Sequence, residues 1–410
     1  MRRTARVLLA ATLLVPLSPA APAAGATPRL VRYTQWDTPA QLASGTARGT
    51  VVARGRLKLA VPQGTTTLNG TMYEWADWTS PYVEPGFDLT ELVPSWEAST
   101  PGDTWIRVSL RGLTGTGTST GWDSISRWAA GDRFVRRSSY GSQPDGGASV
   151  RYDTWAVPAG VRQWQLRVTL LRKKGTTRTP SVDTIGAMVS RLPAELPATS
   201  KPSGVAAGIV LPVPRFSQMI HEGEYPEYDG GGEAWCSPTS TSMVLAYYDA
   251  LPPPTAYEWV DPAYRDRFVA HAARQTFDHS FDGTGNWPFN TAYAATRTGR
   301  AFVTRLRDLR DAERFIAAGI PVVASIEFSK GELDGAPISS TDGHLLVVVG
   351  FTADGDVVVN DPAAPRNRGV RRTYDRAQLE AAWLGGSGGL SYIVSDRAHP
   401  LPARNGATSW

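Results

Sequence analysis

The sequence predicts two domains of different fold class, an all-β sandwich of jelly-roll type over residues 27–192 and an α+β domain over residues 209–398. With 410 residues, of which 41% are hydrophobic, the chain is long enough for two globular domains and too apolar to be disordered. The first half shows only the two-residue period of strands, whereas the second half mixes helical and strand patterns. Between them, residues 193–208 are poor in large apolar side chains and predict a linker.

The first predicted element is an export signal over residues 1–26. Arg2, Arg3 and Arg6 supply positive charge, residues 7–17 form an apolar core, and residues 24–26 offer a small-residue cleavage site. The apolar run is shorter than the roughly 20 residues that a membrane-spanning helix needs. We therefore expect a secreted, extracellular protein without stable membrane insertion, exported by a route that the Arg2-Arg3 pair alone does not define.

The sandwich prediction rests on alternation along the chain. Apolar residues alternate with polar ones in segments 106–110 and 164–170, and glycine-rich turns such as 114–117 separate such runs. Aromatic side chains are frequent here, and they either fill the sandwich core or line a sugar-binding or polymer-binding surface. The candidates for that surface are Tyr73, Trp75, Trp78, Tyr82 and Trp96. We expect the sandwich to place the second domain on a substrate or surface, or to act as a pro-domain.

The second domain is predicted to contain helices first and mainly strands later, which is typical of an α+β fold. Helices are expected at residues 237–249, 264–275, 309–318 and 376–383, and strands at residues 321–328, 344–351 and 357–360. Residues 399–410 form a C-terminal tail.

Cys236 is the only cysteine of the chain, so it cannot form an intramolecular disulfide. It follows the glycine-rich loop 230–232 and precedes Pro238, which favours the first turn of a helix. The unpaired amides of a helix N-terminus favour an anion and can donate to a nearby oxyanion. The alternative is a cysteine that only caps a helix or lies buried and inert. The placement predicts a nucleophilic thiolate.

A thiolate nucleophile needs a base, and the base needs an orienting partner. His344 opens one apolar strand and Asp361 follows the next, with a short turn between the strands. In an antiparallel hairpin the start of one strand lies near the end of the other, so the two side chains are expected to be neighbours. The alternative is an ordinary strand-edge histidine near a turn aspartate.

The order of these elements resembles the stand-alone members of the bacteriocin-processing cysteine peptidase family, the double-glycine leader peptidases, which have a papain-like fold. The resemblance covers roughly residues 211–395. It rests on the segments 213–218, 236–238 with the following helix, 285–290, 343–344 with its apolar strand, and 360–362.

The resemblance implies that Cys236 is the nucleophile, His344 the general base and then acid, Asp361 the imidazole orienter and Gln218 an oxyanion donor. The alternative for Gln218 is a plain loop glutamine. Asn360 competes with Asp361 because papain-like sites can use an amide in the orienting role, but strand alternation puts the two on opposite faces. Beside these residues, we expect Trp235, Trp287 and Asn360 to contact the substrate.

Two features depart from the resemblance. Family members fused to transporters cut leader peptides after a double glycine, but this sequence contains neither transporter membrane segments nor a nucleotide-binding loop, so leader processing is not expected. The family often has glycine after the nucleophile, whereas Ser237 stands here, and a serine is small enough to be tolerated.

The predicted function is that of a secreted cysteine peptidase acting on a peptide or protein substrate, a cell-wall peptide included. Two alternatives stay open: a cell-wall peptide amidase or acyl transferase using the same residues, and a non-catalytic binding protein with a papain-like scaffold. The net charge of +4 says little about partners, and the basic runs are short and lack a recognition motif, so we expect no nucleic-acid partner. His271 and His279 have no third ligand at a metal-binding spacing, so we expect no metal and no cofactor. The sequence carries no signal for an oligomeric state.

Overall fold

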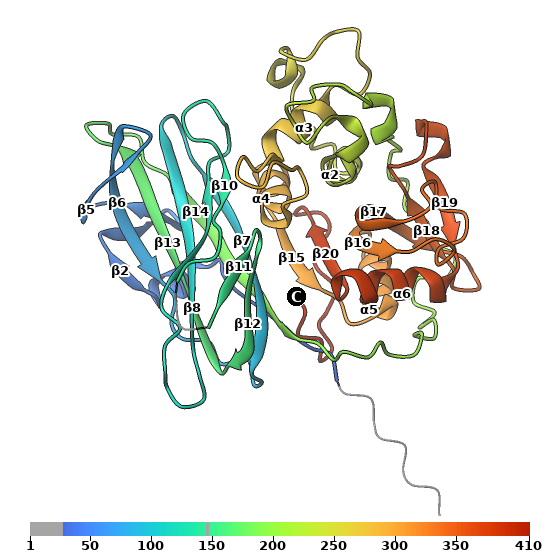
Figure 1. Cartoon of the computed structure of the whole chain (residues 1–410), viewed down its shortest axis with the longest axis horizontal. Coiled ribbons are helices and arrows are strands. Elements are labelled where there is room, and N and C mark those ends of the chain that lie inside the picture. The colour runs from blue at the N-terminus through green and yellow to red at the C-terminus, as the bar shows by residue number, and fades with distance from the viewer. Residues whose placement is uncertain (1–27, 145–146) are drawn as a thin grey trace, which may run out of the picture.

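The computed structural model describes residues 28–144 and 147–410, which form two domains lying side by side (Figure 1). The predicted export signal, residues 1–26, lies outside the described residues. The first domain consists of two antiparallel sheets with one short helix, and the second combines helices with a third sheet. Within the described residues, no helix is both long enough and apolar enough to cross a membrane.

The first domain is built from two sheets of seven strands each. The first sheet, called sheet A, has the order β11 (Ser149–Arg151), β12 (Thr154–Val161), β7 (Leu89–Ser99), β14 (Ser181–Arg191), β4 (Arg56–Leu59) and β3 (Thr50–Ala53), with β1 (Leu30–Trp36) also on β14. The second, called sheet B, has the order β10 (Ser138–Ser139), β9 (Asp123–Trp128), β8 (Thr104–Leu113), β13 (Gln163–Lys173), β6 (Thr71–Thr79) and β2 (Thr46–Arg48), with β5 (Gly64–Leu68) also on β6. Helix α1 (Pro39–Ala43) joins β1 to β2.

The alternation noted in the sequence places one face of each strand in a shared core between the sheets. In β13, Leu166 and Val168 belong to this core, whereas Arg167 between them is half-buried and faces away from it. Trp78 of sheet B and Trp96 of sheet A are almost fully buried in the same core. These two tryptophans therefore fill the sandwich and do not line a binding surface.

The second domain contains one antiparallel sheet, called sheet C, and five helices among its described residues. The strand order is β15 (Ala301–Arg305), β20 (Leu390–Val394), β16 (Val322–Phe328), β17 (Thr341–Phe351), β18 (Val357–Asn360) and β19 (Arg371–Tyr374). The helices are α2 (Cys236–Tyr247), α3 (Phe268–Thr276), α4 (Trp287–Thr298), α5 (Leu309–Ala317) and α6 (Arg376–Ser387).

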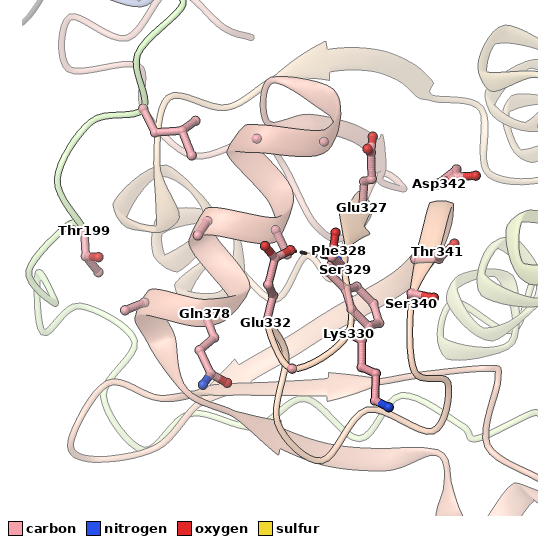
Figure 2. Close-up of a pocket in the computed structure, with 17 residues that line it drawn as sticks. Thr199, Glu327, Phe328, Ser329, Lys330, Glu332, Ser340, Thr341, Asp342 and Gln378 are labelled. Carbon is pink, nitrogen blue, oxygen red and sulfur yellow. Dashed lines mark hydrogen bonds between the residues drawn. The ribbon is translucent and has the colours of Figure 1, made fainter.

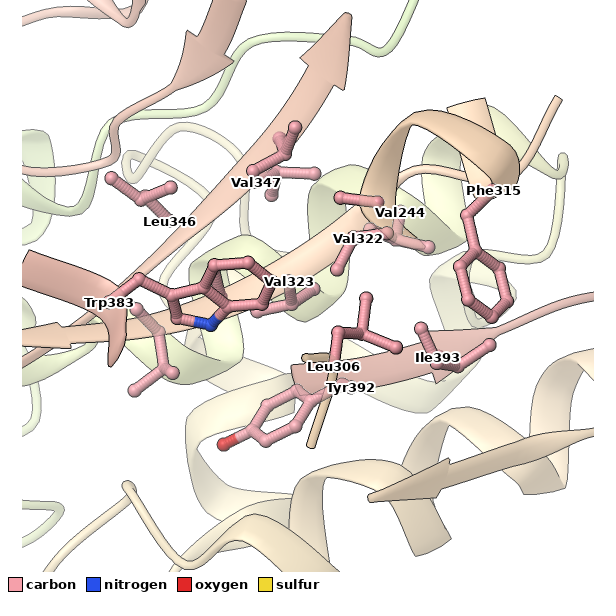
Figure 3. Packing of buried hydrophobic residues seen from close by; sticks show 14 of the residues in the cluster. Val244, Leu306, Phe315, Val322, Val323, Leu346, Val347, Trp383, Tyr392 and Ile393 are labelled. Atoms are coloured by element: carbon pink, nitrogen blue, oxygen red, sulfur yellow. The ribbon is translucent and has the colours of Figure 1, made fainter. Parts of the chain in front are cut away.

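The core of the second domain joins its helices to sheet C. Figure 3 shows Val244 of α2, Phe315 of α5 and Trp383 of α6 in the same cluster as apolar residues of β16, β17 and β20. Full burial of one valine, leucine, isoleucine or phenylalanine side chain stabilises the folded state by about 1.5–3 kcal/mol. Helix α2, which begins at the cysteine, is therefore held firmly on the sheet.

The predicted helices and strands of the second domain were mostly correct, but several elements were missed. The structure confirms the helices at 237–249, 309–318 and 376–383 and all three predicted strands, while α3 begins four residues later than predicted. Helix α4 and strands β15, β19 and β20 were not predicted. Helix α4 shows little amphipathic pattern because residues 288–295 are all buried, so only its caps mark it: Asn286 accepts from the Phe289 amide at 3.1 Å, and Gly299 has a φ of 81°.

The two domains share an extensive interface. Strands β7 and β14 of sheet A pack against the second domain, and Phe289 of α4 enters the sandwich core, where its ring meets that of Trp96 edge to face at 6.2 Å. At the same boundary, Arg305 forms an ion pair with Glu91 at 2.6 Å, and the Val303 amide donates to Ser95 Oγ at 2.8 Å. Aromatic packing and buried polar contacts together hold sheet A against the second domain.

The linker and the tail are docked on the molecule. The predicted linker, 193–208, contains no helix or strand, but the hydroxyl of Ser200 donates to Glu380 at 2.7 Å and its carbonyl accepts from Arg376 at 2.6 Å. In the predicted tail, the carbonyl of Thr408 accepts from the amide of Tyr33 at 2.7 Å, and Trp410 is 1% exposed. Both segments are thus packed against the folded domains.

Candidate active site

Cys236 is the first residue of α2, where the chain leaves a tight loop. The preceding residue, Trp235, has a non-helical backbone and no side chain caps the helix, so the first amides of α2 are not occupied by a capping group. Cys236 is a free, partly exposed cysteine. Ser237 is fully buried and its hydroxyl lies 2.9 Å from the hydroxyl of Tyr392, so the residue that differs from the family pattern packs into the domain.

The glycine-rich loop before Cys236 allows a close approach of two backbone segments. A Cβ at Gly232 would lie 2.3 Å from the backbone carbonyl group of His221, and only glycine avoids this clash. His221 ends the short helix η1 (Gln218–His221), and Gly232 begins η2 (Gly232–Ala234). The loop therefore brings Gln218 to the same region as the start of α2.

Gln218 is 3% exposed and lies between the cysteine loop and the end of β18. Its side-chain Nε2–H donates to the carbonyl of Glu233 at 2.6 Å, and its backbone N–H donates to the carbonyl of Pro362 at 2.9 Å. A side-chain amide has two N–H groups, so one of them remains for a further acceptor.

His344 and Asp361 are paired through a hydrogen bond of 2.8 Å between Nε2 and Oδ1. Both are nearly inaccessible, with 3% and 1% exposure. Asp361 also accepts from the hydroxyl of Tyr374 at 2.7 Å and from the amide of Ala363 at 3.0 Å. Three donors therefore hold one buried carboxylate, and Tyr374 is a member of the site that the sequence reasoning missed.

Burial by itself lowers the pKa of His344, but the charge and hydrogen bond of Asp361, together with contact from Cys236, outweigh it and raise the pKa from 6.5 to about 10. Burial acts in the opposite sense on Asp361, yet His344 and the donors from Tyr374 and Ala363 lower its pKa below 3.8. The pair thus favours an imidazolium beside a carboxylate. Because Nε2 faces Asp361, the other ring nitrogen of His344, Nδ1, is left for Cys236.

Asn360 and Asp361 have different partners, as strand alternation predicts. The side chain of Asn360 donates to the carbonyl of Pro214 at 2.9 Å and accepts from Arg371 at 2.6 Å, and it is fully buried. Asn360 therefore anchors the segment that leads into η1, while Asp361 faces the histidine.

The two tryptophans singled out from the sequence occupy different environments. Trp235 is 0% exposed, donates from Nε1 to the carbonyl of Tyr228 at 2.6 Å, and packs with Val260 and Val269. Its ring therefore offers no accessible surface to a substrate, and it stabilises the loop before α2. Trp287, at the start of α4, lines the same cavity as Cys236.

This cavity, called the central cavity, has a volume of about 660 Å³ and is lined by both domains. The second domain contributes Cys236 and Trp287, and the sandwich contributes the β11–β12 turn with Arg151 and Tyr152. The Tyr152 ring lies 4.1 Å from that of Phe281, across the domain boundary. The sequence offered no signal for this wall, because the turn lies more than 80 residues before Cys236.

Asp153, in the same turn, ties the wall to the start of α4. Its carboxylate accepts from the amide of Trp287 at 3.1 Å, and desolvation raises its pKa to about 7.

Acidic side chains predominate around the central cavity. The Asp, Glu and Arg residues that line it are Glu91, Arg151, Asp153, Asp229, Arg305, Glu327 and Asp342, and Arg305 is already paired with Glu91. Glu327 and Asp342 are exposed and form no ion pair with any described residue.

A groove adjoins the central cavity. It has a volume of about 950 Å³ and shares Glu327, Asp342 and Gly386 with the cavity. Figure 2 shows Glu327 and Asp342 at one end of this groove, with Lys330 and Gln378 toward the other. The cavity and the groove thus form one continuous cleft that runs past Cys236 and has two free carboxylates near its middle. Among the described residues, no group of three or more His, Cys, Asp or Glu side chains is arranged to hold a metal ion.

Both domains match models of known protein families. Residues 32–190 match the model of the peptidase C39 N-terminal domain, and residues 210–389 match that of the peptidase C39-like family. No curated protein matches the chain.

Solved structures similar to parts of the chain include a xylan-binding module, CBM86, of Roseburia intestinalis (16% identity, 40% of this chain, 96% of that chain, TM-score 0.20). Another is the CBM22-1–GH10 module pair of Clostridium thermocellum xylanase 10B (16% identity, 44% of this chain, 32% of that chain, TM-score 0.21). A third is tailspike protein 4 of bacteriophage CBA120 (15% identity, 38% of this chain, 19% of that chain, TM-score 0.18). Similarity at this level does not define a shared fold or ligand.

Proposed function

We propose that this protein is a secreted cysteine peptidase with a papain-like catalytic domain. The proposal starts from the two family matches, which support membership of the C39 peptidase family. Cys236 is the nucleophile, His344 the base and Asp361 its orienting partner. The observation that carries the proposal is the buried His344–Asp361 pair at 2.8 Å, in contact with a cysteine at a helix start that opens on a cleft.

The reaction proceeds by acyl transfer to sulfur. His344 Nδ1 takes the proton of Cys236, and the thiolate attacks the carbonyl carbon of the scissile peptide bond. The backbone N–H of Cys236 and the free side-chain N–H of Gln218 stabilise the oxyanion. The imidazolium then protonates the leaving amine as the C–N bond breaks, which leaves a thioester on Cys236.

Water completes the cycle. His344 takes a proton from a water molecule, whose oxygen attacks the thioester carbon, and the collapsing intermediate releases a carboxylic acid and regenerates the thiol. Throughout both halves, Asp361 keeps the Nε2–H in place and stabilises the imidazolium, while Tyr374 and the Ala363 amide hold the carboxylate.

The acidic cleft supports a substrate class. Glu327 and Asp342 are exposed, unpaired and close to His344, so they favour a peptide that places a lysine or arginine side chain beside the scissile bond. The sandwich contributes Arg151 and Tyr152 to the opposite wall, which makes the first domain part of substrate binding.

The test is hydrolysis of a mixed peptide library and of purified peptidoglycan by the mature chain, beside the Cys236→Ala variant. We expect cleavage of peptides that disappears with Cys236→Ala, and activity surviving this substitution would refute the assignment. Release of amine from peptidoglycan without peptide cleavage would instead favour the cell-wall amidase. A rate of Cys236 alkylation that His344→Ala does not change, with no turnover on either substrate, would favour a non-catalytic binding protein.

A further inference from the structure

Sheet B of the sandwich presents one face on the side of the molecule away from the second domain. Sheet A is in contact with α4 and β15 of the second domain. In Figure 1, β6, β8 and β13 of sheet B lie on the side of the sandwich away from those elements. This outward surface, called the sheet B face, contributes no residue to the cavity around Cys236.

Strand register defines the side chains of the sheet B face. Residues directly opposite one another in antiparallel strands point to the same side. Across β2, β6, β13, β8 and β9, one row runs Arg48, Asp77, Thr169, Arg107 and Arg127, the next runs Thr79, Arg167, Ser109 and Ser124, and a third pairs Gln165 with Arg111. The intervening residues of β6 and β13 belong to the sandwich core.

The face is strongly basic. It carries five arginines and one carboxylate, that of Asp77, in the rows given above. Within residues 28–144 and 147–410, none of these arginines forms an ion pair, in contrast to Arg172 at the end of β13, which pairs with Glu74 at 2.9 Å. Burial lowers the pKa of Arg167, Asp77 opposes this, and the neighbouring charges of Arg111, Arg48 and Arg107 lower it further. The arginines thus repel one another, and an anion bound among them would relieve the repulsion.

The centre of the face offers unpartnered polar groups. Asp77 is 6% exposed and its Oδ1 has no hydrogen-bond partner among the described residues, and the same holds for the hydroxyl of Thr169, which is 0% exposed. The Nε of Arg107 is also buried without a partner. Buried polar groups without partners are costly and are normally satisfied by a ligand or by water. Here both acceptors and donors are left over.

Aromatic rings flank the arginines. The guanidinium of Arg167 lies 3.9 Å from the ring centre of Trp122, and that of Arg111 lies 4.6 Å from the same ring. Tyr82, which is 38% exposed, lies 5.3 Å from the guanidinium of Arg111. Rings held in this way are fixed in orientation and can pack against a flat ligand.

We propose that the sheet B face binds an acidic polysaccharide. Carboxylates of the polymer pair with the arginines, its hydroxyl groups donate to Asp77, and a sugar ring packs beside Trp122 and Tyr82. Double-stranded DNA fits less well, because its phosphodiester backbone carries no hydroxyl group that could donate to Asp77. Binding here leaves the cleft around Cys236 free, so the sandwich can hold the protein on a polysaccharide-rich surface. The proposal does not depend on the proposed catalytic activity.

The experiment measures binding of the full mature chain to polygalacturonate, with dextran, inorganic polyphosphate and double-stranded DNA as comparators. The test variant is Arg107→Gln/Arg167→Gln. The matched control is Arg56→Gln/Arg310→Gln, which removes the same charge from arginines that are paired with Asp183 and Asp308, away from the sheet B face. A hydrogen bond to a charged group corresponds to about a tenfold change in affinity. We expect roughly a hundredfold weaker binding to polygalacturonate for the test variant and a change below threefold for the control.

A second variant tests the hydroxyl contact. Asp77→Asn removes charge repulsion, so it should strengthen binding of polyphosphate while it weakens binding of polygalacturonate. Equal weakening by the test and control variants, no binding of polygalacturonate by the unmodified chain, or binding of DNA or dextran as tight as that of polygalacturonate would each overturn the proposal. Unchanged thermal unfolding of every variant shows that the fold is intact, and the single variant Arg111→Gln replaces any double variant that fails this criterion.

Discussion

Replacing Asp361 by asparagine tests the electrostatic basis of the proposed catalytic pair. An asparagine has nearly the same shape, and its amide oxygen can still accept from His344 Nε2, so the ring keeps its position. What disappears is the negative charge that raises the pKa of His344 against the effect of burial. A hydrogen bond to a charged group contributes about 1.5–3 kcal/mol, and 1.4 kcal/mol is a factor of ten. We therefore expect kcat/KM to fall by about 10- to 150-fold.

The assay combines peptide hydrolysis with nuclear magnetic resonance of labelled histidine. In the unmodified protein His344 should titrate near pH 10. In Asp361→Asn its pKa should fall, because the carboxylate charge no longer opposes the lowering of the pKa by burial. The control is Asp356→Asn, which makes the same change of charge in the turn at the opposite end of the β17–β18 hairpin. We expect it to alter neither the titration nor kcat/KM by more than about twofold.

The same pair links stability to pH. The pKa of His344 is raised on folding, so its contribution is complete below 6.5 and is lost as the pH rises through about 10. The pKa of Asp361 is lowered, so its contribution is complete above 3.8 and is lost at lower pH. The difference in unfolding free energy between the unmodified protein and Asp361→Asn should be greatest between pH 3.8 and 6.5. An Asp361→Asn protein with undiminished kcat/KM, or with His344 still titrating near pH 10, would refute this reasoning.

Three further predictions concern the cleft. Gln218→Ala should lower kcat by about 10²- to 10³-fold, because the contact with the oxyanion is lost. Cys236 should still react with iodoacetamide at an unchanged rate. A parallel fall in the alkylation rate would show a structural effect instead. Glu327→Gln/Asp342→Asn should raise KM by about tenfold for peptides with a lysine or arginine near the scissile bond and leave KM for neutral peptides unchanged. The control variant Glu332→Gln, in the groove, should change KM for neither class of peptide. Equal effects of the double variant on both peptide classes would contradict a preference for basic side chains. Tyr152→Ala should raise KM for long peptides more than for short fluorogenic ones, since the sandwich wall meets only an extended substrate, and an unchanged ratio between the two would remove the sandwich from substrate binding.

The central part of the candidate site was predictable because its signals are local. Pro238 after Cys236 marks a helix start, and α2 begins at the cysteine itself. The two apolar runs around residues 344–360 indicate a hairpin, which brings His344 to Asp361. Strand alternation also correctly separated Asn360 from Asp361, and the two have different partners.

What was missed depends on contacts between distant segments. Tyr374 reaches Asp361 from β19, a four-residue edge strand whose sequence has no apolar alternation. Trp235 looked available because it precedes the cysteine, but tertiary packing against Val260 and Val269 buries it completely. The wall formed by Arg151 and Tyr152 belongs to the other domain, and no local pattern records which face of a sandwich another domain will cover.

The arrangement of the two domains also bears on whether the sandwich is a pro-domain. A removable segment should block the nucleophile and detach without exposing a large apolar surface. Here the sandwich lines the cleft around Cys236 instead of filling it, and Phe289 of α4 is buried within the sandwich core beside Trp96. The Thr408 carbonyl pairs with β1, so the end of the chain is fastened to its first strand. Cutting the linker would leave these contacts in place, which argues for a sandwich that stays bound to the second domain.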